Sequence, residues 1–127
     1  MHRQRYKDKP INKIAYHRWH GMTGAYQFLC AHASTESLRT RLNALGGWQW
    51  TIGDSHWYGD YVACQPFAGV RIRICDFPER VESEYRYRAD VRRAADCKTE
   101  MAVVDAELRK VLSAIGARDV GEIEWFD

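Results

Sequence analysis

The sequence predicts an α+β protein with an antiparallel sheet of about 5–6 strands and two helices on one face of that sheet. Two segments, 70–77 and 82–91, alternate apolar and charged residues as strands do. Two others, 35–45 and 101–115, carry apolar residues at helical spacing. The resulting order of strand, helix, several strands, helix and strand fits a ferredoxin-like βαββαβ plan elaborated by extra hairpin strands.

The chain has the size and composition of one soluble globular domain, covering residues 1–127. Of its 127 residues, 46% are hydrophobic and 28% are charged, which excludes the collagen-like, disordered and disulfide-dense classes. No run of about 18 apolar residues is present, so we expect no membrane-spanning helix. The N-terminal charges precede no apolar stretch, so we expect no secretory signal and a cytoplasmic location.

The first half of the chain predicts a central strand followed by a short helix. Residues 26–33 are apolar on nearly both faces, as in a strand with neighbours on each side. Ser34 supplies an N-cap oxygen for the helix, and Gly46 and Gly47 end it. The apolar face of this helix is expected to consist of Leu38, Leu42 and Leu45.

The segment after this helix is rich in aromatic residues. Trp48, Trp50 and Ile52 alternate with polar residues, so we expect them to share the core face of a strand. Two turn signals follow, at 53–55 and 59–60, and a short strand is expected at 61–65.

The C-terminal third predicts a longer helix and a last strand. Asp96 is the expected cap of the helix, and Gly116 ends it. Residues 119–127 alternate again, with Ile123 and Trp125 on the inner face and Glu122 outside. The apolar stripe of the helix consists of Met101, Val104, Leu108, Val111, Leu112 and Ile115.

Four arginines are predicted to line one face of the hairpin that the two alternating segments form. The apolar residues are even-numbered in the first strand and odd-numbered in the second. Because both apolar faces must lie on the same side of the sheet, opposite positions must sum to an odd number. A sum of 159, with a loop at 78–81, places Arg71 opposite Arg88 and Arg73 opposite Arg86; sums of 157 and 161 are the alternatives. In every case the arginines point away from the core, toward water or a partner.

The arginine row also carries the functional prediction. Like charges directly opposite each other destabilise a ladder by about 0.2–1 kcal/mol per pair, so an anion should offset them. That anion is either a carboxylate of the chain or an external group. The external alternative predicts a binding module (an inhibitor, immunity-type or adaptor protein) for a protein partner with an acidic surface. Its partner-binding residues would be Arg71, Arg73, Arg86 and Arg88, together with Trp57 and Tyr58 between the turn signals.

Two other functions stay open. Residues 1–20 hold six basic residues and one acidic residue. A basic N-terminal arm at about 1–13, ordered or flexible, would suit nucleic-acid binding together with the same arginines. The missing phosphate-loop and dinucleotide motifs lead us to expect no enzyme and no cofactor. A small-molecule-binding domain or an enzyme with an aromatic pocket is the remaining alternative, using Trp48, Trp50, Trp57, Tyr58 and Tyr61.

Four side chains are of the types that bind zinc, namely His17, His20, Cys30 and His32. Their spacing matches no standard zinc site, so we expect packed or solvent-facing imidazoles and no bound metal. The cysteines, at positions 30, 64, 75 and 97, form no C-x-x-C pair. We therefore expect them to be reduced and mostly buried thiols.

Overall fold

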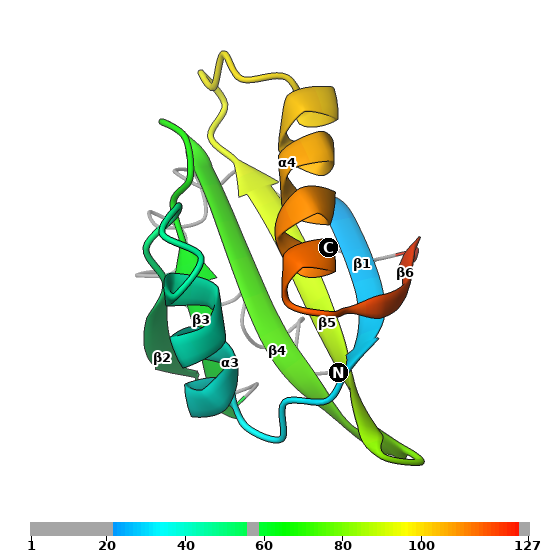
Figure 1. Cartoon of the computed structure of the whole chain (residues 1–127). Helices are drawn as coiled ribbons and strands as arrows, with labels where there is room; N and C mark the ends of the chain where they lie inside the picture. The colour runs from blue at the N-terminus through cyan, green and yellow to red at the C-terminus, as the bar shows by residue number, and fades with distance from the viewer. Residues whose placement is uncertain (1–21, 56–58, 125–127) are drawn as a thin grey trace.

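The computed structural model describes residues 22–55 and 59–124, which form one antiparallel sheet and two helices (Figure 1). The elements run β1 (Met22–Cys30), α3 (Thr35–Asn43), β2 (Thr51–Ser55), β3 (Gly59–Cys64), β4 (Val70–Val81), β5 (Glu84–Arg93), α4 (Met101–Ala114) and β6 (Arg118–Glu122). The six strands lie in the order β2-β3-β4-β5-β1-β6, and every neighbouring pair is antiparallel. The predicted α+β class with an antiparallel sheet is confirmed.

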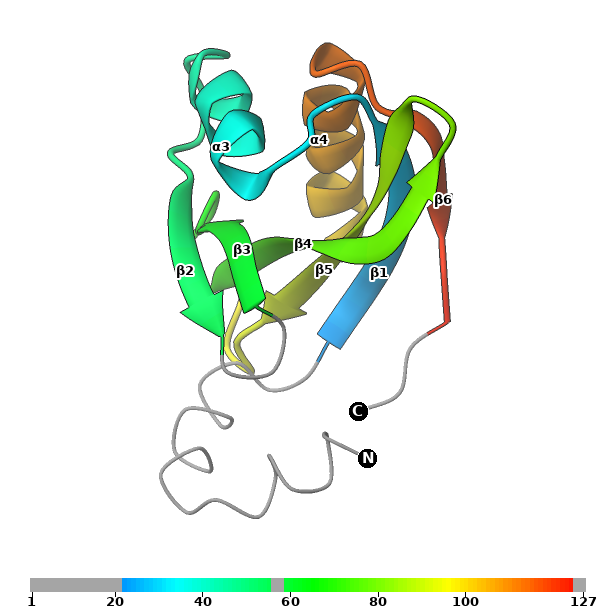
Figure 2. The ribbon, with the colours of Figure 1, turned by 90° about the horizontal axis from the view of Figure 1, so that it is seen from below.

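One hydrophobic core lies against a single face of this sheet, and Figure 2 shows α3 and α4 on the same side of the ribbon. Even-numbered residues of β1 and β4 and odd-numbered residues of β5 point into the core, because strand side chains alternate between faces. Burying one large aliphatic side chain stabilises the fold by about 1.5–3 kcal/mol. The helices contribute five such side chains, Leu38, Leu42, Val104, Leu108 and Leu112.

Helix α3 begins at the predicted cap. The Ser34 hydroxyl accepts a hydrogen bond from the backbone N–H of Ser37 at 3.1 Å. At the other end, the Asn43 amide accepts from the backbone N–H of Trp50 at 2.8 Å and donates to the Trp50 carbonyl at 3.0 Å. These two bonds fix the path of the chain into β2, and Trp50 lies in the core with 2% of its surface exposed.

Helix α4 begins later than predicted. The expected cap, Asp96, lies in a turn that a hydrogen bond from Cys97 N–H to the Ala94 carbonyl closes at 3.0 Å. Glu100 takes the N-cap position and makes no side-chain cap bond. Gly116 follows the helix with a φ of 83°, as predicted. Neither of these two helices is long and apolar enough to span a lipid bilayer.

Strand β2 runs through residues predicted to form a turn. Gly53 lies in the middle of β2, opposite Tyr61 of β3. The second predicted turn, at 59–60, is the beginning of β3. Ile52 was expected in the core but is 36% exposed, because β2 is an edge strand. Gly53, as a strand residue opposite Tyr61, therefore allows the two strands to pack closely and does not reverse the chain.

The β4–β5 hairpin keeps the predicted parity and departs from the predicted register. Opposite positions sum to 163 over most of its length, an odd number as required. None of the three expected sums is observed. Arg71 lies opposite Arg92, and Arg73 lies opposite Asp90.

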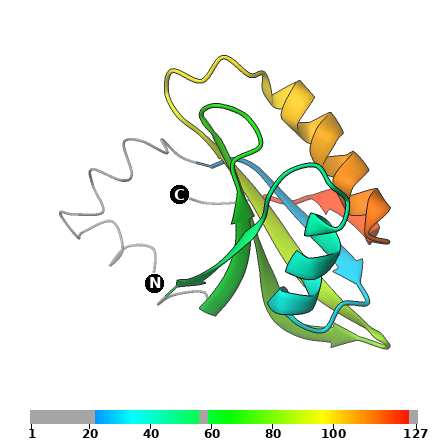
Figure 3. The same ribbon diagram turned by 60° about the vertical axis from the view of Figure 1, so that its left-hand side comes forward.

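The register differs because β4 continues through the predicted loop at 78–81. The pairing register shifts between Asp76 and Arg80. Pro78, which has no backbone N–H to donate to the ladder, lies within this irregular segment. The chain reverses instead at two residues, Glu82 and Ser83, and Glu82 adopts a φ of 57°. Figures 1 and 3 show this end of the hairpin projecting beyond both helices.

Strand β6 pairs with β1 at the edge of the sheet, but its faces are reversed from the prediction. Glu122 lies opposite Tyr26 and forms an ion pair with Arg109 of α4 at 3.8 Å, so it faces the helices. Val120, two residues earlier, packs against the core, so these even-numbered residues face inward. The N–H of Ile123 still continues the ladder by donating to the Ala25 carbonyl at 2.9 Å. The other residue predicted to face inward, Trp125, lies outside the described residues.

Candidate functional site

The candidate functional site is the face of the sheet opposite the hydrophobic core. The four predicted arginines lie there, Arg71 and Arg73 in β4 and Arg86 and Arg88 in β5, because the residues between them point into the core. All four are half-buried and not freely exposed. We name this surface the arginine face and define it by Tyr61, Arg71, Arg73, Arg86, Arg88, Asp90 and Arg92.

Arg73 is neutralised within the chain. Its Nε lies 3.5 Å from Oδ1 of Asp90, directly across the ladder. The two side chains are only 12% and 7% exposed. A pair so little exposed has lost most of its hydration, and its partners depend on each other for compensation. The main role of Arg73 is therefore to stabilise the sheet by compensating the charge of Asp90.

Tyr61 organises the neighbouring arginines. Its ring lies over Gly53, where an added Cβ would come within 2.4 Å of the ring carbon Cζ. The guanidinium carbons of Arg71 and Arg73 lie 6.0 and 5.5 Å from the ring centroid, within the range of cation–π attraction. The missing side chain at Gly53 thus gives the ring its place, and the ring holds two cations beside it.

Arg71 differs from Arg73 in its compensation. Its Nη2 donates a long hydrogen bond of 3.4 Å to the Tyr61 hydroxyl, which is neutral. Among the side chains that the structure describes (23–54, 59–75 and 80–124), no carboxylate lies within ion-pair distance of Arg71. Its cross-strand neighbour is another cation, Arg92. The chain therefore provides this half-buried guanidinium with a hydrogen bond and no described counter-charge.

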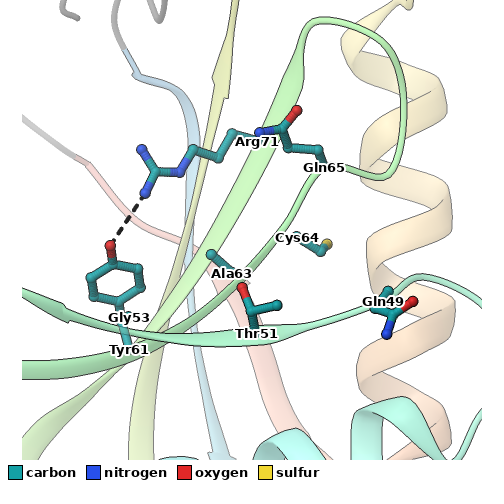
Figure 4. A pocket seen from close by; sticks show the side chains of 8 residues that line it. All are labelled: Gln49, Thr51, Gly53, Tyr61, Ala63, Cys64, Gln65 and Arg71. Carbon is teal, nitrogen blue, oxygen red and sulfur yellow. Dashed lines mark hydrogen bonds between the residues drawn. The ribbon is translucent and has the colours of Figure 1, made fainter.

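A hollow of about 300 Å³ opens beside Arg71, where β2, β3 and β4 lie next to one another (Figure 4). Figure 4 shows the Arg71 side chain extended toward Tyr61. The alternation of Trp48, Trp50 and Ile52 with polar residues predicts that Gln49 and Thr51 face away from the core, but no pattern in the sequence predicts that they lie near Arg71. The lining includes Gln49, Thr51, Tyr61, Ala63, Gln65 and Arg71, and no carboxylate.

Of the predicted aromatic residues, Tyr61 belongs to this site and Trp48 does not. Trp57 and Tyr58 lie outside the described residues, so their predicted role is neither supported nor opposed. Trp48 packs against Trp50 and Phe67, with ring centroids 6.2 and 6.0 Å away, and belongs to the margin of the core. The predicted aromatic cluster is thus divided, with Tyr61 on the opposite face of the sheet.

Of the candidate metal ligands, the two that the structure describes make different contacts. His17 and His20 lie outside the described residues. Cys30 is buried, and its thiol donates to the Ile115 carbonyl at 3.8 Å, whereas His32 Nδ1 lies 3.2 Å from the Ser37 hydroxyl. In the part of the chain that the structure describes, no group of three or more histidine, cysteine or acidic residues could hold a metal ion.

Two polar contacts elsewhere hold secondary structure together and change side-chain pKa values. Burial and a 2.8 Å hydrogen bond to Asp105 of α4 raise the pKa of Tyr26 above its ordinary value. Arg109 also donates to Asp105, at 3.1 and 3.2 Å. Hydrogen bonds from Arg118 Nε, at 3.0 and 3.2 Å, lower the pKa of Glu84. These contacts fasten α4 to β1 and β6 to β5.

Comparison with known proteins assigns neither a family nor a role to the chain. No family matches it, and no curated protein or solved structure is significantly similar to it. A proposal for the function of this protein therefore rests on the geometry of the arginine face.

Proposed function

We propose that this protein is a small binding module that recognises acidic groups of a partner protein through the arginine face, in the manner of an inhibitor, immunity-type or adaptor protein. The observation that carries the proposal is the Arg71 guanidinium, half-buried and bonded to a neutral phenol with no described carboxylate beside it. A partly desolvated cation without a counter-ion is unfavourable. A partner's carboxylate would restore the missing compensation.

The cross-strand neighbours of Arg71 support the same proposal. Arg92, another cation, lies directly opposite Arg71 and so supplies no counter-charge to it. Arginine and tyrosine are also the residues that most often anchor protein interfaces. The positive charge would mainly speed encounter and select acidic partners.

We also propose that the fold is a ferredoxin-like βαββαβ sheet with β2 and β3 inserted as an extra hairpin. Without these two strands, the sheet order becomes β4-β5-β1-β6, with α3 after β1 and α4 before β6. In this plan both helices cover one face, and the arginine face is left for a partner. A cytoplasmic location belongs to the same proposal and is supported by the four cysteines, all of which are free.

Titration with synthetic polyanions tests the proposed function. Poly-L-glutamate is the probe for an acidic protein surface, and single-stranded DNA and RNA are the competing probes, each measured by calorimetry at about 50 and 200 mM salt. We expect poly-L-glutamate to bind and Arg71→Gln to weaken it about tenfold, because a charge-assisted hydrogen bond contributes about 1.5–3 kcal/mol. The charge-matched control is Lys98→Gln, an exposed residue outside the arginine face.

The outcomes separate the candidate functions. Tighter binding of DNA or RNA, with a steep loss at high salt, would contradict the proposal and favour the nucleic-acid alternative. Absence of binding to every polyanion would also contradict it. Equal losses for Arg71→Gln and Lys98→Gln would show that net charge acts without a defined site.

A further inference from the structure

We infer that the hollow beside Arg71 is a subsite for a single carboxylate, the side chain of an aspartate or glutamate on the partner. This inference rests on the proposed function and goes further, because it names the group that is bound and the place that receives it.

Two donors converge at one edge of the hollow. The Tyr61 hydroxyl oxygen accepts from Arg71 at 3.4 Å, so its own hydrogen is left to donate elsewhere. The described residues offer no acceptor for this hydrogen. Arg71 keeps further N–H groups that the single bond to Tyr61 does not use. A guanidinium beside a phenol O–H presents donors to both oxygens of one carboxylate.

The rest of the hollow is polar and suits an acidic side chain. Its floor is half-buried, at Gly53, Tyr61, Ala63 and Arg71. Its rim is exposed and carries the Thr51 hydroxyl and the amides of Gln49 and Gln65. The volume of about 300 Å³ is at the lower end of ligand sites. A side chain with its terminal carboxylate fits these dimensions, and no acidic lining residue would repel it.

The charge of the site favours a monoanion. Asp90 already compensates Arg73, the second arginine beside Tyr61. Arg71 is therefore the cation that the hollow itself contributes. A carboxylate carries one negative charge and matches this single cation, whereas a phosphate monoester carries about 1.5 to 2 at neutral pH and would leave an excess of negative charge. Charge matching thus selects a carboxylate.

The side chain of a partner residue is the source that we infer, and blocked peptides test it. A blocked tetraglutamate peptide is the probe, and blocked tetraglutamine, tetraglutamine with a free C-terminal carboxylate, and inorganic phosphate are the comparisons. Binding is measured by calorimetry or NMR titration. We expect only tetraglutamate to bind clearly, because it alone offers side-chain carboxylates.

A variant that fills the hollow without changing any charge tests most directly whether the carboxylate binds there. Ala63→Leu places additional carbon atoms on the floor, and we expect tetraglutamate affinity to fall about tenfold or more. Ala102→Leu, at an exposed position of α4, is the matched control and should leave affinity unchanged. Thr51→Leu fills the rim and serves if Ala63→Leu does not fold. Tyr61→Phe removes the second donor and should weaken binding several-fold.

The outcomes distinguish this inference from the proposed function. If Ala63→Leu and Thr51→Leu bind tetraglutamate as the unmodified protein does while Arg71→Gln does not, the subsite is wrong and the proposed function stands. If neither tetraglutamate nor poly-L-glutamate binds, both fail. Stronger binding of phosphate or of the free C-terminal carboxylate would overturn the inference by naming a different anion.

Discussion

Replacing Arg73 by methionine tests whether the Arg73–Asp90 pair is structural. The substitution keeps an apolar side chain of similar length and removes the cation that lies 3.5 Å from the Asp90 carboxylate. Asp90 would then remain 5% exposed with its charge uncompensated. The expected result is a large loss of stability with no change of fold.

The expected magnitude follows from the burial of the pair. At 3.5 Å two unit charges attract by about 5 kcal/mol if the effective dielectric constant is about 20. Exposed pairs contribute about 0–1 kcal/mol, and removing one partner of a buried pair costs about 3–5 kcal/mol. With exposures of 12% and 7%, Arg73→Met should cost about 3 kcal/mol in the free energy of unfolding.

Urea unfolding followed by circular dichroism measures this change. The control is Arg71→Met, which removes an arginine from the same strand without breaking a described ion pair and should cost less than about 1 kcal/mol. The double variant Arg73→Met/Asp90→Leu removes both charges and should recover most of the lost stability. Equal losses for Arg73→Met and Arg71→Met, or no recovery in the double variant, would refute the reasoning.

Three further predictions concern close packing and pH. Gly53→Ala should displace the Tyr61 ring, because the new Cβ would come within 2.4 Å of it. Stability should fall by about 1 kcal/mol and poly-L-glutamate binding should weaken, and unchanged ring resonances in NMR spectra would contradict this. Because the pKa of Glu84 is lowered in the folded protein, its ionised carboxylate stabilises the fold at pH values above its ordinary pKa. This stabilisation is lost as the pH falls through the lowered pKa. Arg118→Gln should therefore raise the Glu84 pKa toward its ordinary value in a carboxylate NMR titration, and an unmoved pKa would show that the bond is weak. Because the pKa of Tyr26 is raised in the folded protein, its neutral hydroxyl stabilises the fold fully below about pH 10. This stabilisation is lost as the pH rises further. Tyr26→Phe loses the hydrogen bond to α4, at a cost of about 1 kcal/mol near neutral pH, and should show a smaller alkaline loss in urea unfolding.

The sequence predicts those features of the fold that depend on local rules. The alternation of side chains with a period of two places the arginines on one face whatever the register, and the odd-sum rule holds. The cap at Ser34 and the end of α4 at Gly116 follow from single residues whose chemistry suits those positions.

The features that local rules miss depend on contacts between distant residues. Proline in the β4–β5 connection predicts a loop there, but the strand absorbs Pro78 in a register shift and turns later. Gly53 has the sequence signature of a turn, and only the ring of Tyr61 across the ladder explains why a strand needs it. The different compensation of Arg71 and Arg73 follows from the register, so no pattern in the sequence separates them.

The most direct test of the central claim is the Nε–Hε NMR signal of Arg71 during titration with poly-L-glutamate. This signal should shift on binding, and the exchange of its proton with water should slow. The Arg73 signal should change little, because Asp90 already holds that guanidinium. An Arg71 signal that does not respond while the protein binds, or an Arg73 signal that responds more strongly, would contradict the account.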